Sequence, residues 1–404
     1  MAIIRPFRAH RPPQSIVARV ASPPYDVINT KEARALAKGN DDSFLHVSRP
    51  EIDLPEDTDD HDDRVYAQAA INLKGLIDRH ALVQDASPQL YVYAQIMGTH
   101  RQVGLVACAS VEDYVEDRIK KHEKTRQDKE DDRTRHIDTL GAHDEPVFLT
   151  YKAVADIDTV MATVTATAPV YDFDTDDAVH HTLWIVDASL TDKLVELFSR
   201  VDALYVADGH HRSASAARVH AVRKGQAGEH DRFLAVIFPH DQMQILAYNR
   251  LVRDTQHRTP EQLLALLKAK FDVRPATSPI PDKPRTYCAF LGGTWYELTV
   301  RDGSYDAADP VASLDASICQ DQILAPMFGI EDPRRDKNID FVGGIRGPAE
   351  LERRVREEGW HLALHLHPTR IEQLIAVSDA GMLMPPKSTW FEPKLRSGLF
   401  LHTF

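Results

Sequence analysis

The sequence has few cysteines and no long apolar segment. Its 404 residues include only Cys108, Cys288 and Cys319, which lie far apart and match no metal-binding or redox spacing. No apolar run approaches the ~20 residues that a membrane-spanning helix needs, and arginines interrupt the apolar residues near the N-terminus, which therefore has no secretory signal pattern. We expect a cytoplasmic protein with no membrane partner.

Several familiar ligand-binding motifs are also missing. There is no GxxxxGK[ST] loop and no HExxH zinc motif, and the FVGG segment at residues 341–344 lacks the third glycine of a dinucleotide fingerprint. Positive charge is in deficit as well, because 48 Lys and Arg against 61 Asp and Glu give a net charge of −13. Since nucleic-acid binding requires cations that neutralise phosphates, this balance argues against nucleic acid as a partner.

What the sequence contains is typical of a folded α/β protein. Hydrophobic residues make up 43% and charged residues 27%, near the globular average, and the length suggests two or three domains. Apolar patterns predict a helix over 65–77 and strands at 43–47, 147–151, 203–207 and 362–366. Helical and strand patterns alternate, which indicates an α/β or α+β fold. We divide the chain into regions 1–165, 166–260 and 261–404.

The first segment that could carry chemistry is LYVADGHHRSASAAR, residues 204–218. An apolar strand ends at Asp208-Gly209, and an alanine-rich helix follows within four residues. Free N–H groups at a helix start favour an anion, and Arg212 and Ser213 would add phosphate donors. The structural alternative is a capped helix with exposed histidines. Because two histidines, an arginine and a serine crowd one turn, we favour a functional role.

Two further segments are rich in polar side chains. Residues 120–136, KKHEKTRQDKEDDRTRH, contain no apolar side chain; they would form either a solvated helix with i,i+4 ion pairs or a mobile arm whose cations clamp phosphates. Residues 384–398, MPPKSTWFEPKLRSG, place aromatic residues beside hydroxyls and three cations near the chain end. The aromatic residues would anchor this segment in the core, and Lys387, Ser388, Thr389 and Lys394 could line an anion pocket.

Taken together, these motifs resemble a known family along nearly the whole chain. The family is the DUF family numbered 1015, sometimes labelled SpoOJ/ParA/ParB-like. The matching segments are IRPFRAHRP from Ile4, SPPYDVI from Ser22, SFLHV from Ser43, IKKHEKTRQDKEDDR from Ile119, YVADGHHRSASA from Tyr205, FVGGIRG from Phe341 and MPPKSTWFEPKLRSGL from Met384. The resemblance implies a multi-domain protein with a ParB/sulfiredoxin-like nucleotide-binding core and the DGHHR turn in region 166–260.

The DGHHR turn is also similar to that of the archaeal ADP-dependent free-serine kinase. This resemblance implies a nucleotide-dependent phosphotransferase that acts on serine or, in reverse, on phosphoserine, with ADP or ATP and Mg²⁺ as cofactors. A ParB-like nucleotide-binding protein without small-molecule turnover, or a metal-dependent phosphohydrolase, remains an alternative. We expect a nucleotide and a small-molecule substrate as partners and allow for a homodimer; the metal ligands stay open.

The expected site residues follow from the segments and the resemblance together. Glu123 is our choice of base because it lies beside His122 and four nearby cations. The expected catalytic residues are Glu123, His122, Asp208, His210 and His211. The expected nucleotide- or phosphate-binding residues are Gly209, Arg212, Ser213, Lys121, Lys124, Arg126, Lys387, Ser388, Thr389 and Lys394.

Overall fold

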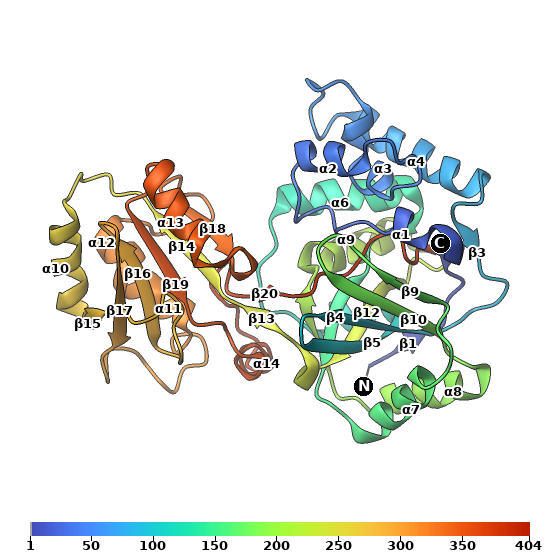
Figure 1. The fold of residues 1–404 in the computed structure, drawn as a ribbon. Coiled ribbons are helices and arrows are strands. Elements are labelled where there is room, and N and C mark those ends of the chain that lie inside the picture. The colour runs from blue at the N-terminus through green and yellow to red at the C-terminus, as the bar shows by residue number, and fades with distance from the viewer. Residues whose placement is uncertain (1) are drawn as a thin grey trace. The chain divides into compact units, whose positions relative to one another are not determined.

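The computed structural model describes residues 2–404, which fold into two compact units. The N-terminal unit contains the chain up to residue 121, residues 125–243 and residues 393–404, and the C-terminal unit contains residues 122–124 and 244–392. The end of the chain, red in Figure 1, is therefore part of the N-terminal unit. The division into regions 1–165, 166–260 and 261–404 stays a prediction.

A mixed nine-stranded sheet forms the centre of the N-terminal unit. Strands β8 (Val147–Tyr151) and β12 (Arg232–Pro239) run parallel, as do β6 (Ile119–Lys120) and β11 (Leu204–Asp208), and the remaining pairs are antiparallel. The path of the sheet is β6 (Ile119–Lys120), β11 (Leu204–Asp208), β8 (Val147–Tyr151), β12 (Arg232–Pro239), β5 (His100–Ser110), β4 (Tyr91–Met97), β10 (Val179–Ile185) and β9 (Tyr171–Asp174), with β1 (Ile4–Arg5) paired to β5.

Helices cover this sheet and bury its apolar side chains. Helix α9 (His210–Val222) contacts β8 and β12 and packs against α6 (Gln127–Leu140), whereas α7 (Ala155–Thr165) packs against α8 (Ala188–Phe198) and contacts β4 and β10. Figure 1 shows these two helix pairs at different ends of the unit. Strand β8 is buried along its whole length and β12 is buried from Phe233 to Pro239, as expected for parallel strands covered on both faces.

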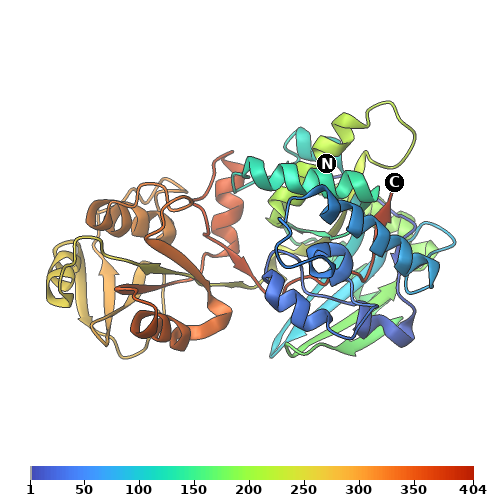
Figure 2. The ribbon, with the colours of Figure 1, turned by 90° about the horizontal axis from the view of Figure 1, so that it is seen from above.

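The C-terminal unit is built on a six-stranded antiparallel sheet with helices on both faces (Figure 2). Leu251, Phe290 and Ala363 face helix α13 (Gly347–Glu357), whereas their neighbours along the strands face the other core, as the two-residue period of a strand requires. The order is β15 (Phe271–Pro275), β17 (Thr294–Val300), β16 (Thr286–Leu291), β19 (Leu362–Leu366), β14 (Tyr248–Val252) and β18 (Ile339–Gly343). The second core lies beneath α10 (Pro260–Lys270), α11 (Asp315–Cys319), a π-helical turn (Gln320–Leu324) and α12 (Ala325–Phe328).

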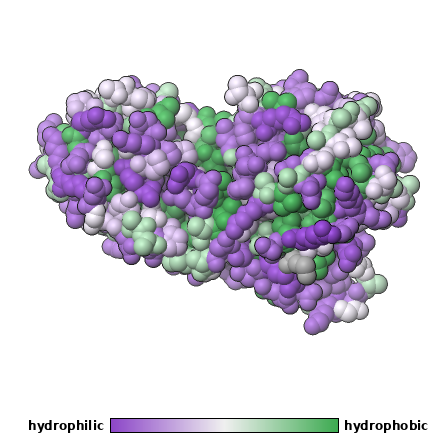
Figure 3. Space-filling model, turned by 90° about the horizontal axis from the view of Figure 1, so that it is seen from below, coloured by the Kyte–Doolittle hydropathy of each residue, from purple (hydrophilic) through white to green (hydrophobic). Residues whose placement is uncertain are grey.

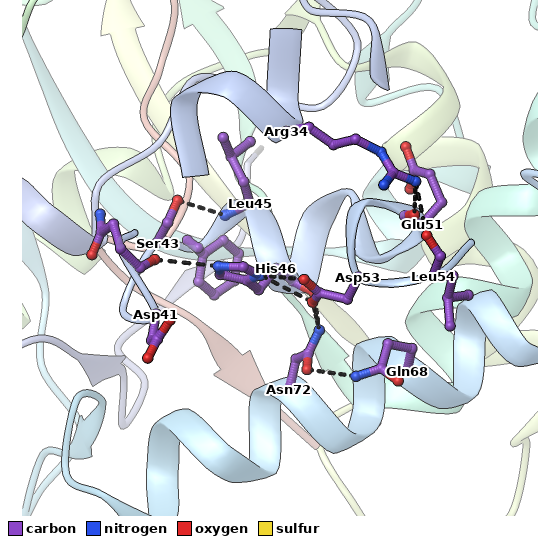
Figure 4. A network of polar contacts seen from close by, with 12 residues as sticks. Arg34, Asp41, Ser43, Leu45, His46, Glu51, Asp53, Leu54, Gln68 and Asn72 are labelled. Atoms are coloured by element: carbon purple, nitrogen blue, oxygen red, sulfur yellow. Dashed lines mark hydrogen bonds and ion pairs between the residues drawn. The ribbon is translucent and has the colours of Figure 1, made fainter. Parts of the chain in front are cut away.

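This architecture confirms the predicted α/β class and most predicted elements. The strands at 147–151 and 362–366 are β8 and β19, and the helix over 65–77 is α4 (Asp63–Asp78). The predicted strand at 43–47 is wrong, since its second half is the helix α3 (Leu45–Ser48). Figure 4 shows the reason: His46 Nδ1 lies 2.8 Å from Asp53 Oδ1, and Asn72 of α4 donates to Asp53 and to the His46 carbonyl oxygen.

The surface seen in Figure 3 is mainly hydrophilic, with smaller hydrophobic areas between the polar side chains. Among residues 2–404, no helix combines the length and the apolar composition needed to cross a bilayer.

Candidate functional site

The site is built on the turn between β11 and α9, as the sequence predicts. Strand β11 ends at Asp208, Gly209 follows with φ +94°, and α9 begins at His210. Left-handed backbone of this kind favours glycine, and a Cβ atom on Gly209 would also lie only 3.1 Å from Arg212 Nε. Glycine therefore lets the chain turn sharply from β11 into α9, so that the N-terminal end of this helix directly follows Asp208.

Asp208 is held by a cation from the far end of the chain. Its Oδ1 accepts a hydrogen bond from Gly209 N at 2.8 Å, and its Oδ2 accepts one from Lys394 Nζ at 2.8 Å. Burial would raise the pKa of Asp208, but the charges of Lys394 and Arg212 outweigh burial and hold that pKa far below its usual range. Asp208 is therefore a permanent carboxylate near neutral pH.

Arg212 is buried between several carboxylates. Its Nη1 donates to the carbonyl oxygen of Pro146, and its Nη2 lies 3.7 Å from Asp26 Oδ2 and 3.8 Å from Asp208 Oδ1. Both distances exceed a normal hydrogen bond, so Nη2 is attracted by two carboxylates and is hydrogen-bonded to neither. Such an arrangement retains donor capacity for an oxyanion.

Glu145 is a member of this cluster that the sequence did not reveal. Its Oε1 accepts hydrogen bonds from Tyr25 N at 3.0 Å and from Ser397 Oγ at 2.8 Å. Burial raises the pKa of Glu145 to about 7, with Arg212 opposing the rise and Asp144 and Asp26 adding to it. The only sequence signal for this region is the SPPYDVI segment from Ser22, one of the segments that match the family.

The histidines and the serine of the turn have different environments. His210 and Ser213 are buried, and Ser213 Oγ donates to the Gly209 carbonyl oxygen at 3.2 Å. His211 Nε2 accepts the backbone N–H of Arg126 at 3.1 Å. An accepting Nε2 places the proton of a neutral imidazole on Nδ1, so the hydrogen bond with Arg126 fixes the tautomer of His211.

Two predicted phosphate-binding cations of the N-terminal unit are engaged near their own positions in the sequence. Lys121 Nζ donates to the Tyr114 carbonyl oxygen at 3.1 Å and lies 3.6 Å from Asp117. Arg126 pairs with Asp128 at 2.7 Å. The helical interpretation of this segment is correct for residues 127–140, which form α6.

The remaining predicted residues belong to the C-terminal unit, where they bring two distant motifs together. His122, Glu123 and Lys124 are in this unit with Lys387, Ser388 and Thr389. Met384 N donates to the His122 carbonyl oxygen at 2.8 Å, and Thr389 Oγ1 lies 3.4 Å from His122 Nε2. The HEKT and PPKST motifs are thus neighbours in space.

The N-terminal unit is therefore a mixed α/β unit with a buried ionic cluster at the start of a helix. The chain belongs to the family described as "Protein of unknown function (DUF1015)", whose model matches residues 4–317. This membership confirms the family resemblance of the motifs that lie within residues 4–317. No protein with a curated description matches the chain.

Several solved structures are similar to this chain at low sequence identity. A conserved hypothetical protein from Pyrococcus furiosus is 13% identical, with a TM-score of 0.34 and coverage of 68% of this chain and 87% of that chain. A free serine kinase in complex with AMP is 11% identical, with a TM-score of 0.36 and coverage of 74% and 87%. SbnI with C-terminal truncation from Staphylococcus aureus is 11% identical, with a TM-score of 0.40 and coverage of 72% and 85%.

Proposed function

We propose that this protein transfers a phosphoryl group between a nucleotide and serine or phosphoserine, with the nucleotide phosphates at the start of α9. The observation that carries the proposal is the convergence of backbone donors behind Gly209 with the guanidinium of Arg212 and the ammonium of Lys394. A helix start with two cations favours an anion of high charge. The serine substrate rests on the sequence resemblance of the DGHHR turn to the free-serine kinase.

The residues of the turn suit the parts that phosphoryl transfer needs, which are positioning and neutralisation of charge. The backbone N–H groups of His210, His211 and Arg212 would hold phosphate oxygens, and the guanidinium of Arg212 would be a further donor. Mg²⁺ prefers carboxylate oxygens, and Asp208 and Asp26 offer them beside the same guanidinium. When bound, the ion would neutralise phosphate charge; Asp208 and Asp26 would orient it.

Proton transfer at the serine hydroxyl is assigned to Glu123, the base expected from the sequence. Its neighbour His122 is buried and held by the C-terminal segment through Met384 and Thr389. A Glu123→Gln variant should keep nucleotide binding and lose turnover, because an amide cannot accept the proton.

The direct test incubates the purified full-length protein with Mg²⁺ and either serine or phosphoserine plus AMP, ADP or ATP, and follows products by ³¹P NMR. Transfer of phosphate between nucleotide and serine supports the proposal. Release of inorganic phosphate without a nucleotide would indicate a phosphohydrolase. A nucleotide-dependent rise in melting temperature without any turnover would indicate a binding protein.

Gly209→Ala tests the phosphate-binding turn. The new methyl group would meet Arg212 and strain a backbone with φ +94°, so we expect turnover to fall by roughly 10²–10³, the loss typical of one preorganised donor. Gly225→Ala is the matched control, because Gly225 also has a positive φ of +86° but no atom lies within 4 Å of its added Cβ. Equal activity of the two variants would contradict the assignment.

A further inference from the structure

The C-terminal unit contains a buried arginine that lacks a carboxylate partner. Arg250 lies in the middle of β14 with only 3% of its surface exposed. Its Nη1 donates to the Tyr248 carbonyl oxygen, and its Nε has no hydrogen-bond partner among residues 2–404. A buried charge without a counter-charge is costly, so this side chain calls for an explanation.

Other largely covered arginines of the same unit are compensated. Arg258 lies 2.5 Å from Asp254, and Arg285 lies 3.3 Å from Asp315. Arg250 forms no salt bridge with any carboxylate of the described chain, although it is more deeply buried than either of these residues. The unit therefore pairs two half-buried arginines with carboxylates but leaves the more deeply buried Arg250 without one.

The polar neighbours of Arg250 do not supply a negative charge. Burial raises the pKa of the Cys319 thiol to about 12 and raises the pKa of Tyr287 well above its usual value, so both groups stay neutral at physiological pH. Burial also lowers the pKa of Arg250 itself, and the neighbouring Cys319 and Tyr287 oppose this lowering only in part. The ring of Phe341, centred 5.3 Å from the guanidinium carbon, attracts the cation but carries no net charge.

A second cation lies on the same group of aromatic rings. Phe341 packs edge-on against Tyr248 with ring centres 5.9 Å apart, and Lys387 Nζ lies 5.5 Å from the centre of the Tyr248 ring. Lys387 has φ +58°, a conformation that costs energy for a residue with a side chain and that clusters at functional sites. Two cations thus flank one pair of aromatic rings within the C-terminal unit.

We propose that Arg250, with Lys387 as a second cation, forms an oxyanion-binding site in the C-terminal unit. Its ligand is a small molecule that carries a carboxylate or a phosphate monoester, because the planar guanidinium matches the two oxygens of either group. The bound oxyanion supplies the counter-charge that the protein does not provide. Both residues belong to the C-terminal unit, whereas the DGHHR turn belongs to the N-terminal unit, and the proposal does not rest on the proposed phosphotransferase activity.

The test measures the melting temperature of the full-length protein with succinate, phosphoethanolamine or inorganic phosphate, against potassium chloride at equal ionic strength. At about a hundred times the dissociation constant, mass action should raise the melting temperature by roughly 5–10 °C. Succinate and phosphoethanolamine distinguish the two ligand classes, since succinate carries carboxylates but no phosphate and phosphoethanolamine carries a phosphate monoester but no carboxylate. Gly209→Ala should keep this response, which separates the site from the α9 turn.

The decisive variant is Arg250→Met, which replaces the charge with an apolar chain of similar length. It should melt no lower than the wild type without ligand, since it removes an uncompensated buried charge, and it should lose the oxyanion response. Arg258→Met is the control: it breaks a paired arginine, should melt lower and should keep the response. If Arg250→Met does not fold, Arg250→Lys replaces it as the test variant. Lysine lacks the planar guanidinium with its paired N–H donors, so binding should weaken by roughly tenfold or more.

Two results would overturn the proposal. One is a wild-type protein whose melting temperature responds to no oxyanion beyond the chloride control. The other is an Arg250 variant that keeps the wild-type response.

Discussion

The contact between Lys394 and Asp208 joins the C-terminal segment to the end of β11 within the N-terminal unit, and Lys394→Met should reveal its strength. The ammonium lies 2.8 Å from Asp208 Oδ2, and the two side chains are only 18% and 27% exposed. A charge-assisted hydrogen bond of this kind contributes ~1.5–3 kcal/mol, and removing one partner leaves the other charge partly buried. For a unit of this size, we expect the melting temperature to fall by roughly 3–10 °C at neutral pH.

The pH dependence makes this prediction specific. The pKa of Asp208 is depressed in the folded protein, so its stabilising contribution is present above the unfolded pKa of ~3.9 and is lost as pH falls through the folded pKa. The deficit of Lys394→Met should therefore be largest near pH 7 and shrink toward the acid end of the stability curve.

The assay is calorimetric or fluorescence-monitored unfolding of both proteins between pH 2 and 8. Lys193→Met is the control, because Lys193 is exposed on α8 and forms no ion pair among the described residues. Identical melting temperatures for the Lys394 and Lys193 variants at neutral pH would refute the reasoning. So would a deficit that stays constant down to pH 2, because the ionised carboxylate would then not be its cause.

Two further predictions concern titratable groups. Because burial raises the pKa of Glu145 to about 7, its ionisation destabilises the fold as pH rises from ~4.5 to 7. In urea unfolding, Glu145→Gln should therefore be more stable than the wild type by about 3 kcal/mol at pH 8 and equal to it near pH 4. A variant that is less stable than the wild type at pH 8 would contradict this cause. The hydrogen bond to Asp53 raises the pKa of His46. The stabilisation of ~1 kcal/mol from this hydrogen bond is therefore complete below the unfolded pKa of ~6.5 and is lost as pH rises through the folded pKa. His46→Gln should cost more stability at pH 5.5 than at pH 9, and an equal cost at both pH values would contradict the role of the charged pair.

Local sequence patterns determined most elements of this protein, including the turn that carries the candidate site. The apolar run at residues 204–207, the Asp208-Gly209 pair and the alanine-rich segment specify strand, turn and helix, because burial, positive φ and helix propensity act on adjacent residues. The same logic succeeded for α4 and for the strands β8 and β19. It failed at 43–47, where a short alternating segment fits either structure and contacts from Asp53 and Asn72 decide.

Only the tertiary structure decided which charges meet. Asp208 and Lys394 are 186 positions apart, and Glu145 is joined to Ser397 across 252 positions. No local pattern encodes such pairs, since they depend on strand order and on the return of the chain end to the N-terminal unit. Burial likewise depends on the tertiary structure. The sequence shows that Glu145 and Arg250 are ionisable, but only the surrounding fold removes water from them. Burial then gives Glu145 a near-neutral pKa and leaves Arg250 with an unpaired charge.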